Sequence, residues 1–158
     1  MVELLLDTSY LLPAFGVALR LEAFNERFPT ILEAYSVLYN PISLVEAKWV
    51  VLRLSRRRAA DRARLLESYR LGLRVLLADE RLKQTNLTSE TVEQVADGLL
   101  VDKKSADYFD RMIYGTACAG EVLLLTEDEE LLGLKSDKAV PRPRDILSWK
   151  DLLKRSEG

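Results

Sequence analysis

Short, unbroken apolar runs alternate along the chain with longer segments in which apolar residues recur every three or four positions. The unbroken runs are typical of strands buried on both faces of a sheet, and they predict strands at residues 2–6, 36–39 and 121–125. The helical spacing predicts helices at residues 43–57, 59–78, 89–100, 105–119 and 149–154. Strands and helices therefore alternate along nearly the whole sequence.

Three further segments give weaker signals. Residues 19–35 have a helical pattern that Pro29 should break, so we expect helical pieces packed as a hairpin beside the sheet. Residues 82–87 and 138–140 predict two more short strands.

The alternation predicts an α/β fold, with three layers (α/β/α) around a central, mostly parallel sheet, in one domain spanning residues 1–158. A chain of 158 residues, 48% of them hydrophobic, can form one stable core. Ligands bind beyond the carboxyl ends of parallel strands. Asp7 and Asp128 each follow a predicted strand closely, so the pattern places both acids at that edge of the sheet.

Composition narrows the chemistry, because the chain contains no histidine. This excludes a Ser-His-Asp triad, a Cys-His pair, a histidine acid–base ribonuclease and an ordinary histidine-rich zinc site. Carboxylates that hold a hard cation through oxygen remain available. The single Cys118 has no second cysteine to pair with. We see neither a signal-peptide pattern nor an apolar run near the ~20 residues that span a bilayer, and therefore expect a cytoplasmic protein with no membrane partner.

Arginines cluster in one part of the chain, although the net charge is only -2. Six of them lie between Arg53 and Arg64. Taken singly, such side chains usually form a solvated helix surface. As a cluster they could form a stripe that follows a phosphate backbone, with Arg53, Arg56 and Arg57 nearest the preceding acid Glu46.

Each candidate acid also has an ordinary structural interpretation. Asp7 could cap a helix, and Ser43 with Glu46 has the pattern of a capping box. Ser105 could cap the helix whose first turns carry Asp107 and Asp110, where the helix dipole favours acids. Thr126 and Asp128 fit another helix start in the same way. Glu127, Glu129 and Glu130 are expected to be surface acids.

The four acids stand in short motifs whose order resembles the PIN-domain family. The motifs are LLDTSYL at 5–11, ISLVEA at 42–47, DRMIYGTA at 110–117 and LLTED at 124–128. The resemblance implies an acidic quartet of catalytic, metal-binding residues, Asp7, Glu46, Asp110 and Asp128. It also implies supporting hydroxyls from Thr8 or Ser9 and from Thr126, while Asp107 could reach the same side of its helix as Asp110.

The resemblance implies a metal-dependent endoribonuclease that cuts single-stranded RNA. Converging carboxylates repel one another unless a cation neutralises them, and oxygen ligands alone favour Mg²⁺ or Mn²⁺. Tyr10, Phe15 and Tyr114 are candidates to stack on bases, although aromatic residues at such positions are more often core. Small family members include VapC-type toxins, so an antitoxin partner and a homodimer are also implied.

Two alternatives remain open. One is a non-catalytic, PIN-like RNA-binding or scaffold domain, which the intact acidic quartet argues against. The other is a phosphotransfer or phosphatase domain with Asp7 as nucleophile. The haloacid dehalogenase-like form of such a site would have a second aspartate two residues later, where this chain has Ser9.

Overall fold

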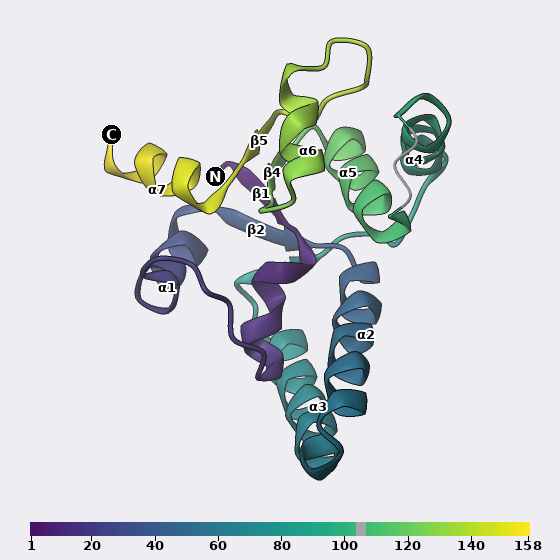
Figure 1. Cartoon of the computed structure of the whole chain (residues 1–158). Helices are drawn as coiled ribbons and strands as arrows, with labels where there is room; N and C mark the ends of the chain where they lie inside the picture. The colour runs from purple at the N-terminus through teal and green to yellow at the C-terminus, as the bar shows by residue number, and fades with distance from the viewer. Residues whose placement is uncertain (104–106) are drawn as a thin grey trace.

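A five-stranded, entirely parallel sheet forms the centre of the computed structural model, which describes residues 1–103 and 107–158 (Figure 1). The strand order is β3-β2-β1-β4-β5, and every neighbouring pair runs parallel. The strands are β1 (Glu3–Leu6), β2 (Ser36–Tyr39), β3 (Leu82–Gln84), β4 (Leu123–Leu125) and β5 (Asp145–Leu147). The strands expected at 2–6, 36–39, 82–87 and 121–125 are therefore confirmed, with shorter bounds for most of them.

Successive residues of the central strands face two separate hydrophobic cores. Leu4 and Leu6 of β1 pack into one core, while Leu5 packs into the other. In β4, Leu124 likewise faces the opposite side from its two neighbours. Residues 4–6 of β1 and all of β4 are completely buried, which explains why they appear in the sequence as unbroken apolar runs.

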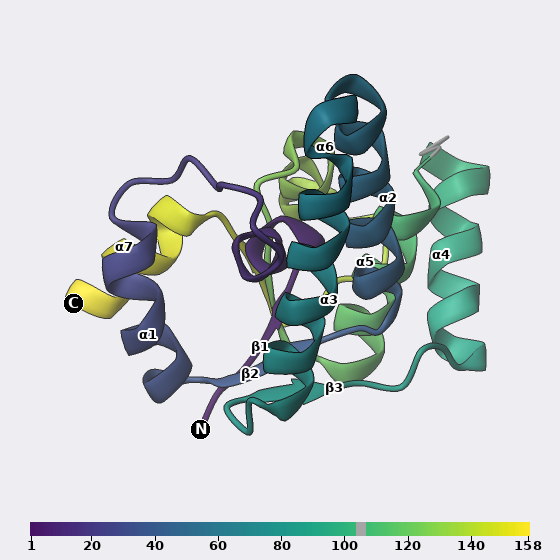
Figure 2. The ribbon, with the colours of Figure 1, turned by 90° about the horizontal axis from the view of Figure 1, so that it is seen from below.

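Helices cover both faces of this sheet and complete the three layers that the sequence predicts (Figures 1 and 2). The first core is covered by η1 (Thr8–Phe15), α1 (Phe24–Ala34), α2 (Ile42–Arg57), α3 (Arg62–Ala78) and α7 (Trp149–Glu157). The second is covered by α4 (Glu90–Lys103), α5 (Tyr108–Gly120) and α6 (Glu129–Gly133). Two short 3₁₀ turns, η2 (Ala59–Asp61) and η3 (Leu134–Ser136), link these elements. None of the described helices is both long enough and apolar enough to cross a membrane.

Helices α2 and α3 lie side by side and extend well beyond the sheet (Figures 1 and 2). The base of this pair packs closely on η1. A Cβ at Gly72 of α3 would lie 2.0 Å from the backbone oxygen of Ala14, so only glycine permits this approach. The ring of Phe15 stacks on Tyr69 at 4.7 Å, and the Tyr69 hydroxyl donates to the backbone oxygen of Leu44.

Three sequence-based expectations were wrong. Pro29 lies inside α1 without breaking it, and burial of Phe24, Ile31 and Leu32 offsets the backbone hydrogen bond that proline cannot donate. The segment before α1 contains the 3₁₀ helix η1 rather than half of a hairpin. Residues 138–140 form a turn, and the last strand is β5, which pairs with β4.

Candidate acidic site

The candidate site lies at the carboxyl ends of β1 and β4. The chain order reverses between these two strands, because β1 is followed by β2 on one side and by β4 on the other. Such a reversal opens a crevice beyond the strand ends, where α/β proteins bind ligands. The Asp7 amide donates to the Leu125 carbonyl at 2.9 Å, which holds the two strand ends together at this point.

Asp7 is fixed by hydrogen bonds to both of its carboxylate oxygens. The Thr8 amide donates to Oδ1 at 2.7 Å, so Asp7 does cap η1, and the Thr126 hydroxyl donates to Oδ2 at 2.6 Å. Burial raises the pKa of Asp7, the two hydrogen bonds oppose that rise, and the charges of Asp128 and Asp107 add to it. Only 5% of the residue is exposed.

Glu46 lies in the second turn of α2 and bonds to η1. The predicted capping box is wrong, since Pro41 occupies the N-cap position and makes no side-chain cap. The Ile42 amide is instead satisfied by Asn40, which leaves Glu46 free to accept a hydrogen bond from the Thr8 hydroxyl. Burial raises the pKa of Glu46 to about 7, with a further contribution from the charge of Asp7.

Asp110 is in the first turn of α5, and Asp107 is the N-cap of that helix. The side chain of Asp107 accepts the Asp110 amide at 3.1 Å, whereas Ser105, the expected cap, lies outside the described residues. The pKa of Asp110 is raised to about 8, first by burial and then by the surrounding carboxylates, which are Asp7, Asp107, Asp128 and Glu46. The structure therefore brings the whole predicted quartet, together with Asp107, within electrostatic range of Asp110.

Asp128 caps α6 through one oxygen, which accepts the Leu131 amide at 2.9 Å. The neighbouring Thr126 links this cap to the first strand, because its hydroxyl accepts the Asp128 amide and donates to Asp7. Thr126 is fully buried. Two of the expected supporting hydroxyls therefore contact acids: Thr126 donates to Asp7, and Thr8 donates to Glu46. The third candidate, Ser9, is half-buried next to Thr8.

The candidate RNA-binding arginines lie on α2 beyond Glu46. Arg53 is two turns further along the helix, and its positive charge lowers the pKa of Glu46, opposing the effect of burial. Arg56 and Arg57 are exposed in the last turn of α2, at the outer end of the extended helix pair. Of the three, Arg53 is the one whose charge contributes to the pKa of a site acid.

Asn40 is a buried residue that the sequence reasoning did not select. Its side-chain oxygen accepts the Ile42 amide at 2.8 Å, and its side-chain nitrogen donates to the Thr116 hydroxyl at 2.8 Å and to the Leu87 carbonyl at 3.0 Å. One side chain thus ties the start of α2, which carries Glu46, to α5. Buried polar groups need hydrogen-bond partners of this kind. In the sequence alone, however, an asparagine before a proline indicates only a turn, so nothing marked Asn40 as buried.

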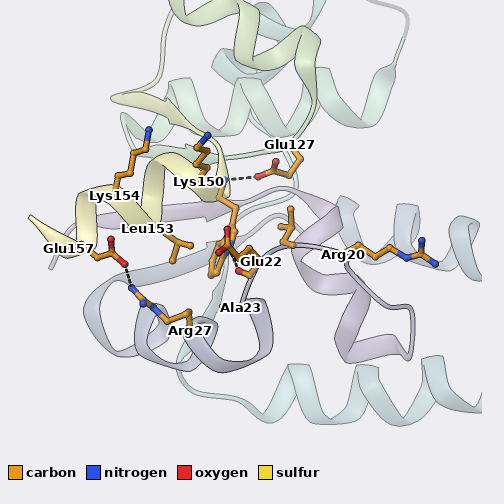
Figure 3. Close-up of a pocket in the computed structure, with 11 residues that line it drawn as sticks. Arg20, Glu22, Ala23, Arg27, Glu127, Lys150, Leu153, Lys154 and Glu157 are labelled. Atoms are coloured by element: carbon orange, nitrogen blue, oxygen red, sulfur yellow. Dashed lines mark hydrogen bonds and ion pairs between the residues drawn. The ribbon is translucent and has the colours of Figure 1, made fainter.

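Glu127 was expected to be a surface acid, and this expectation was wrong. It accepts hydrogen bonds from the Tyr10 hydroxyl and from the backbone amide of Trp149, so it anchors the start of α7 next to the acidic site. It also borders a cavity of about 470 Å³ between α7 and the segment before α1 (Figure 3). Arg27 and Glu157 form an ion pair at 3.0 Å on the wall of this cavity.

The donor chemistry of the site fits a hard divalent cation. The candidate ligands are carboxylates alone, and the burial and mutual repulsion that raise the pKa of Asp110 would be relieved by a positive ion. Across the residues that the structure describes, no three acidic or cysteine side chains are grouped so that they could already hold a metal ion. The acids are therefore near one another without forming a complete coordination shell.

The fold and the acids together define a PIN domain. The family model for the PIN domain matches residues 4–135, and the chain belongs to this family. Members of the family are generally nucleases and typically use divalent metal ions. No curated protein matches the chain in sequence.

Solved structures agree with this fold at low sequence identity. VapBC2 from Rickettsia felis, bound to a DNA fragment from its promoter, has a TM-score of 0.63 and 14% identity, with coverage of 94% of this chain and 99% of that one. PAE2754 from Pyrobaculum aerophilum has a TM-score of 0.61 and 17% identity, with coverage of 98% and 96%. DNA-bound VapBC from Salmonella typhimurium has a TM-score of 0.58 and 18% identity, with coverage of 94% and 99%.

Proposed function

We propose that this PIN domain is a metal-dependent endoribonuclease that hydrolyses phosphodiester bonds of single-stranded RNA. Asp7, Glu46, Asp110 and Asp128 are its catalytic acids and the ligands of Mg²⁺ or Mn²⁺. The observation that carries the proposal is the raised pKa of Asp110, to which every other acid of the quartet contributes. Perturbed carboxylates gathered at a strand-end crevice are typical of functional sites.

Different residues of the chain would position the metal-binding carboxylates and bind the RNA. Thr126 and the Thr8 amide fix Asp7, while the Thr8 hydroxyl fixes Glu46, so these two carboxylates keep their relative positions. A bound divalent ion would supply positive charge against the phosphate and favour deprotonation of the attacking water. Arg53, with Arg56 and Arg57 further along α2, would hold the RNA backbone.

The test is cleavage of a labelled single-stranded RNA with Mg²⁺, Mn²⁺ or EDTA. Asp7→Asn and Glu46→Gln should abolish metal-dependent cutting, whereas Glu130→Gln, at an exposed acid of α6, should cut like the unchanged protein. Single-stranded DNA of the same sequence tests the preference for RNA. RNA binding without cleavage under any metal would favour the non-catalytic alternative, and a phosphorylated Asp7 would favour phosphotransfer.

We also propose that the chain is the toxin of a toxin-antitoxin pair. Two similar structures are VapBC proteins, and this chain has an apolar groove of about 220 Å³ between η1, α1 and α3 that suits an apolar segment of an antitoxin. Tyr10, Phe28 and Val75 are among its lining residues. A basic side chain from the antitoxin could also enter the acidic site and displace the metal.

This second proposal predicts a stoichiometric small partner that inhibits cleavage and that Val75→Asp no longer binds. Isolation of an uninhibited chain from its native cell would contradict it. The homodimer implied by family membership is tested separately, by light scattering of the purified chain.

A further inference from the structure

Two half-exposed aromatic side chains belong to the helices that carry acids of the candidate site. Trp49 of α2 and Tyr108 of α5 are each 49% exposed, and both belong to helices that carry site acids. The three rings considered from sequence, Tyr10, Phe15 and Tyr114, are at most 2% exposed, so their faces are covered and cannot stack on a base. The exposed rings are therefore the ones available for binding.

Trp49 lies between a site acid and a positive charge on one stripe of α2. It follows Glu46 by three residues and precedes Arg53 by four, spacings that make side chains neighbours on a helix surface. Arg53 lowers the pKa of Glu46, so its positive charge reaches this acid of the site. An indole flanked in this way is suited to a ligand that has both negative charge and flat rings.

Tyr108 is held in place at the start of α5. The guanidinium carbon of Arg111 lies 5.6 Å from the centre of the Tyr108 ring, and Arg111 is only 7% exposed. A buried cation against one part of the ring restricts its movement and adds positive charge beneath it. Helices α2 and α5 are in contact, so the two rings lie on adjoining elements around the same acids.

We propose that Trp49 and Tyr108 stack on unpaired bases next to the phosphate that the acids would cleave. The inference rests on the proposed nuclease function and extends it by naming a base-binding surface. Stacking needs an exposed base face and tolerates any base, so it would select single strands over duplexes with little dependence on sequence. The nearby arginines supply the complementary charge for the backbone.

Intrinsic fluorescence offers a direct test, because the chain has only two tryptophans and the other, Trp149, is 2% exposed. A twelve-nucleotide oligouridine, added in EDTA to prevent cleavage, should quench Trp49, and Trp49→Phe should remove the response. Trp49→Ala should weaken single-strand binding by about tenfold or more, and Tyr108→Ala should weaken it in the same direction. Trp49→Phe should retain most of the affinity.

Matched controls separate stacking from a general loss of binding. Leu77→Ala, at an exposed position of α3, should leave affinity unchanged, and Trp49→Ala should not alter binding of an RNA duplex of equal length. Unchanged single-strand affinity in Trp49→Ala would overturn the inference, as would an equal loss on the duplex. A changed oligomeric state with unchanged RNA affinity would overturn it in favour of a contact between copies.

The outcomes also distinguish this inference from the nuclease proposal. If the unchanged protein binds the oligonucleotide through Trp49 but never cuts RNA with metal, the base-binding surface stands and the nuclease proposal fails. If Trp49→Ala cuts RNA with unchanged KM and kcat, the nuclease proposal stands and the stacking inference is wrong.

Discussion

Asp110→Asn should stabilise the metal-free protein while abolishing its cleavage activity. The pKa of Asp110 is raised from 3.8 to about 8, so in the folded state the carboxyl group keeps its proton until the pH approaches 8. The unfolded chain gives up that proton near its usual pKa. The contribution of Asp110 to stability is therefore most favourable below about pH 4 and becomes less favourable as the pH rises to about 8, and a neutral amide removes this loss.

The size of the gain follows from the pKa shift and the solvent exposure of the site. At about 1.4 kcal/mol per pKa unit, a fully buried group with this shift would lose roughly 6 kcal/mol. Asp110 is only partly buried, and solvent screening reduces the effect, so we expect a gain of about 2 kcal/mol. For a chain of this length, that raises the unfolding midpoint by roughly 4 to 8 °C.

Thermal unfolding in EDTA at pH 8 and pH 5 measures this effect. The gain should shrink by more than half at pH 5, because this pH lies only about one unit above the pKa of the acid in the unfolded chain, whereas pH 8 lies about four units above it. Asp137→Asn is the matched control, because Asp137 pairs with Lys103 at 2.7 Å and its pKa is lowered, so its neutralisation should bring no gain. Equal stabilisation at both pH values, or none at pH 8, would refute the electrostatic reasoning.

Three further predictions concern positioning, packing and metal binding. Asn40→Ala should lower the free energy of unfolding by about 2 to 3 kcal/mol in urea titrations, because it leaves buried partners unsatisfied. Gly72→Ala should destabilise strongly, since its Cβ would lie 2.0 Å from a backbone oxygen, whereas Gly98→Ala, with open space around it, should gain roughly 0.5 to 1 kcal/mol by the same measurement. Calorimetry should find that Mg²⁺ affinity rises between about pH 6 and 8 as Glu46 and Asp110 lose their protons, and a flat profile would contradict their role as ligands.

The central strands could be predicted because a strand that is buried on both faces has apolar residues at every position. Residues 4–6 and 123–125 face two cores, and a run of leucines is the direct result. β5 has only three residues and begins with the half-buried Asp145. Its place in the sheet depends on pairing with β4, a long-range contact that no local pattern encodes.

Helix starts were harder to predict, because several polar residues compete for the same backbone amides. Ser43 and Glu46 match the sequence pattern of a capping box. In the structure, however, Asn40 accepts the Ile42 amide at the start of α2, and Glu46 accepts the Thr8 hydroxyl. That bond joins residues 38 positions apart, which local spacing cannot reveal. The positions of the acids along the chain were therefore predictable, but their partners and their altered pKa values required the fold.

Capping and catalysis first stood as rival interpretations of the acids, but the structure shows that an acid can cap a helix and still act electrostatically on the candidate site. Asp128 gives one oxygen to the Leu131 amide, while its charge still raises the pKa of Asp110. Asp7 caps η1, and its charge likewise raises the pKa of Asp110. An amide side chain retains an oxygen that can accept the cap hydrogen bond but removes the charge. Asp-to-Asn substitutions can therefore separate the two roles at this site, whereas alanine would remove both at once.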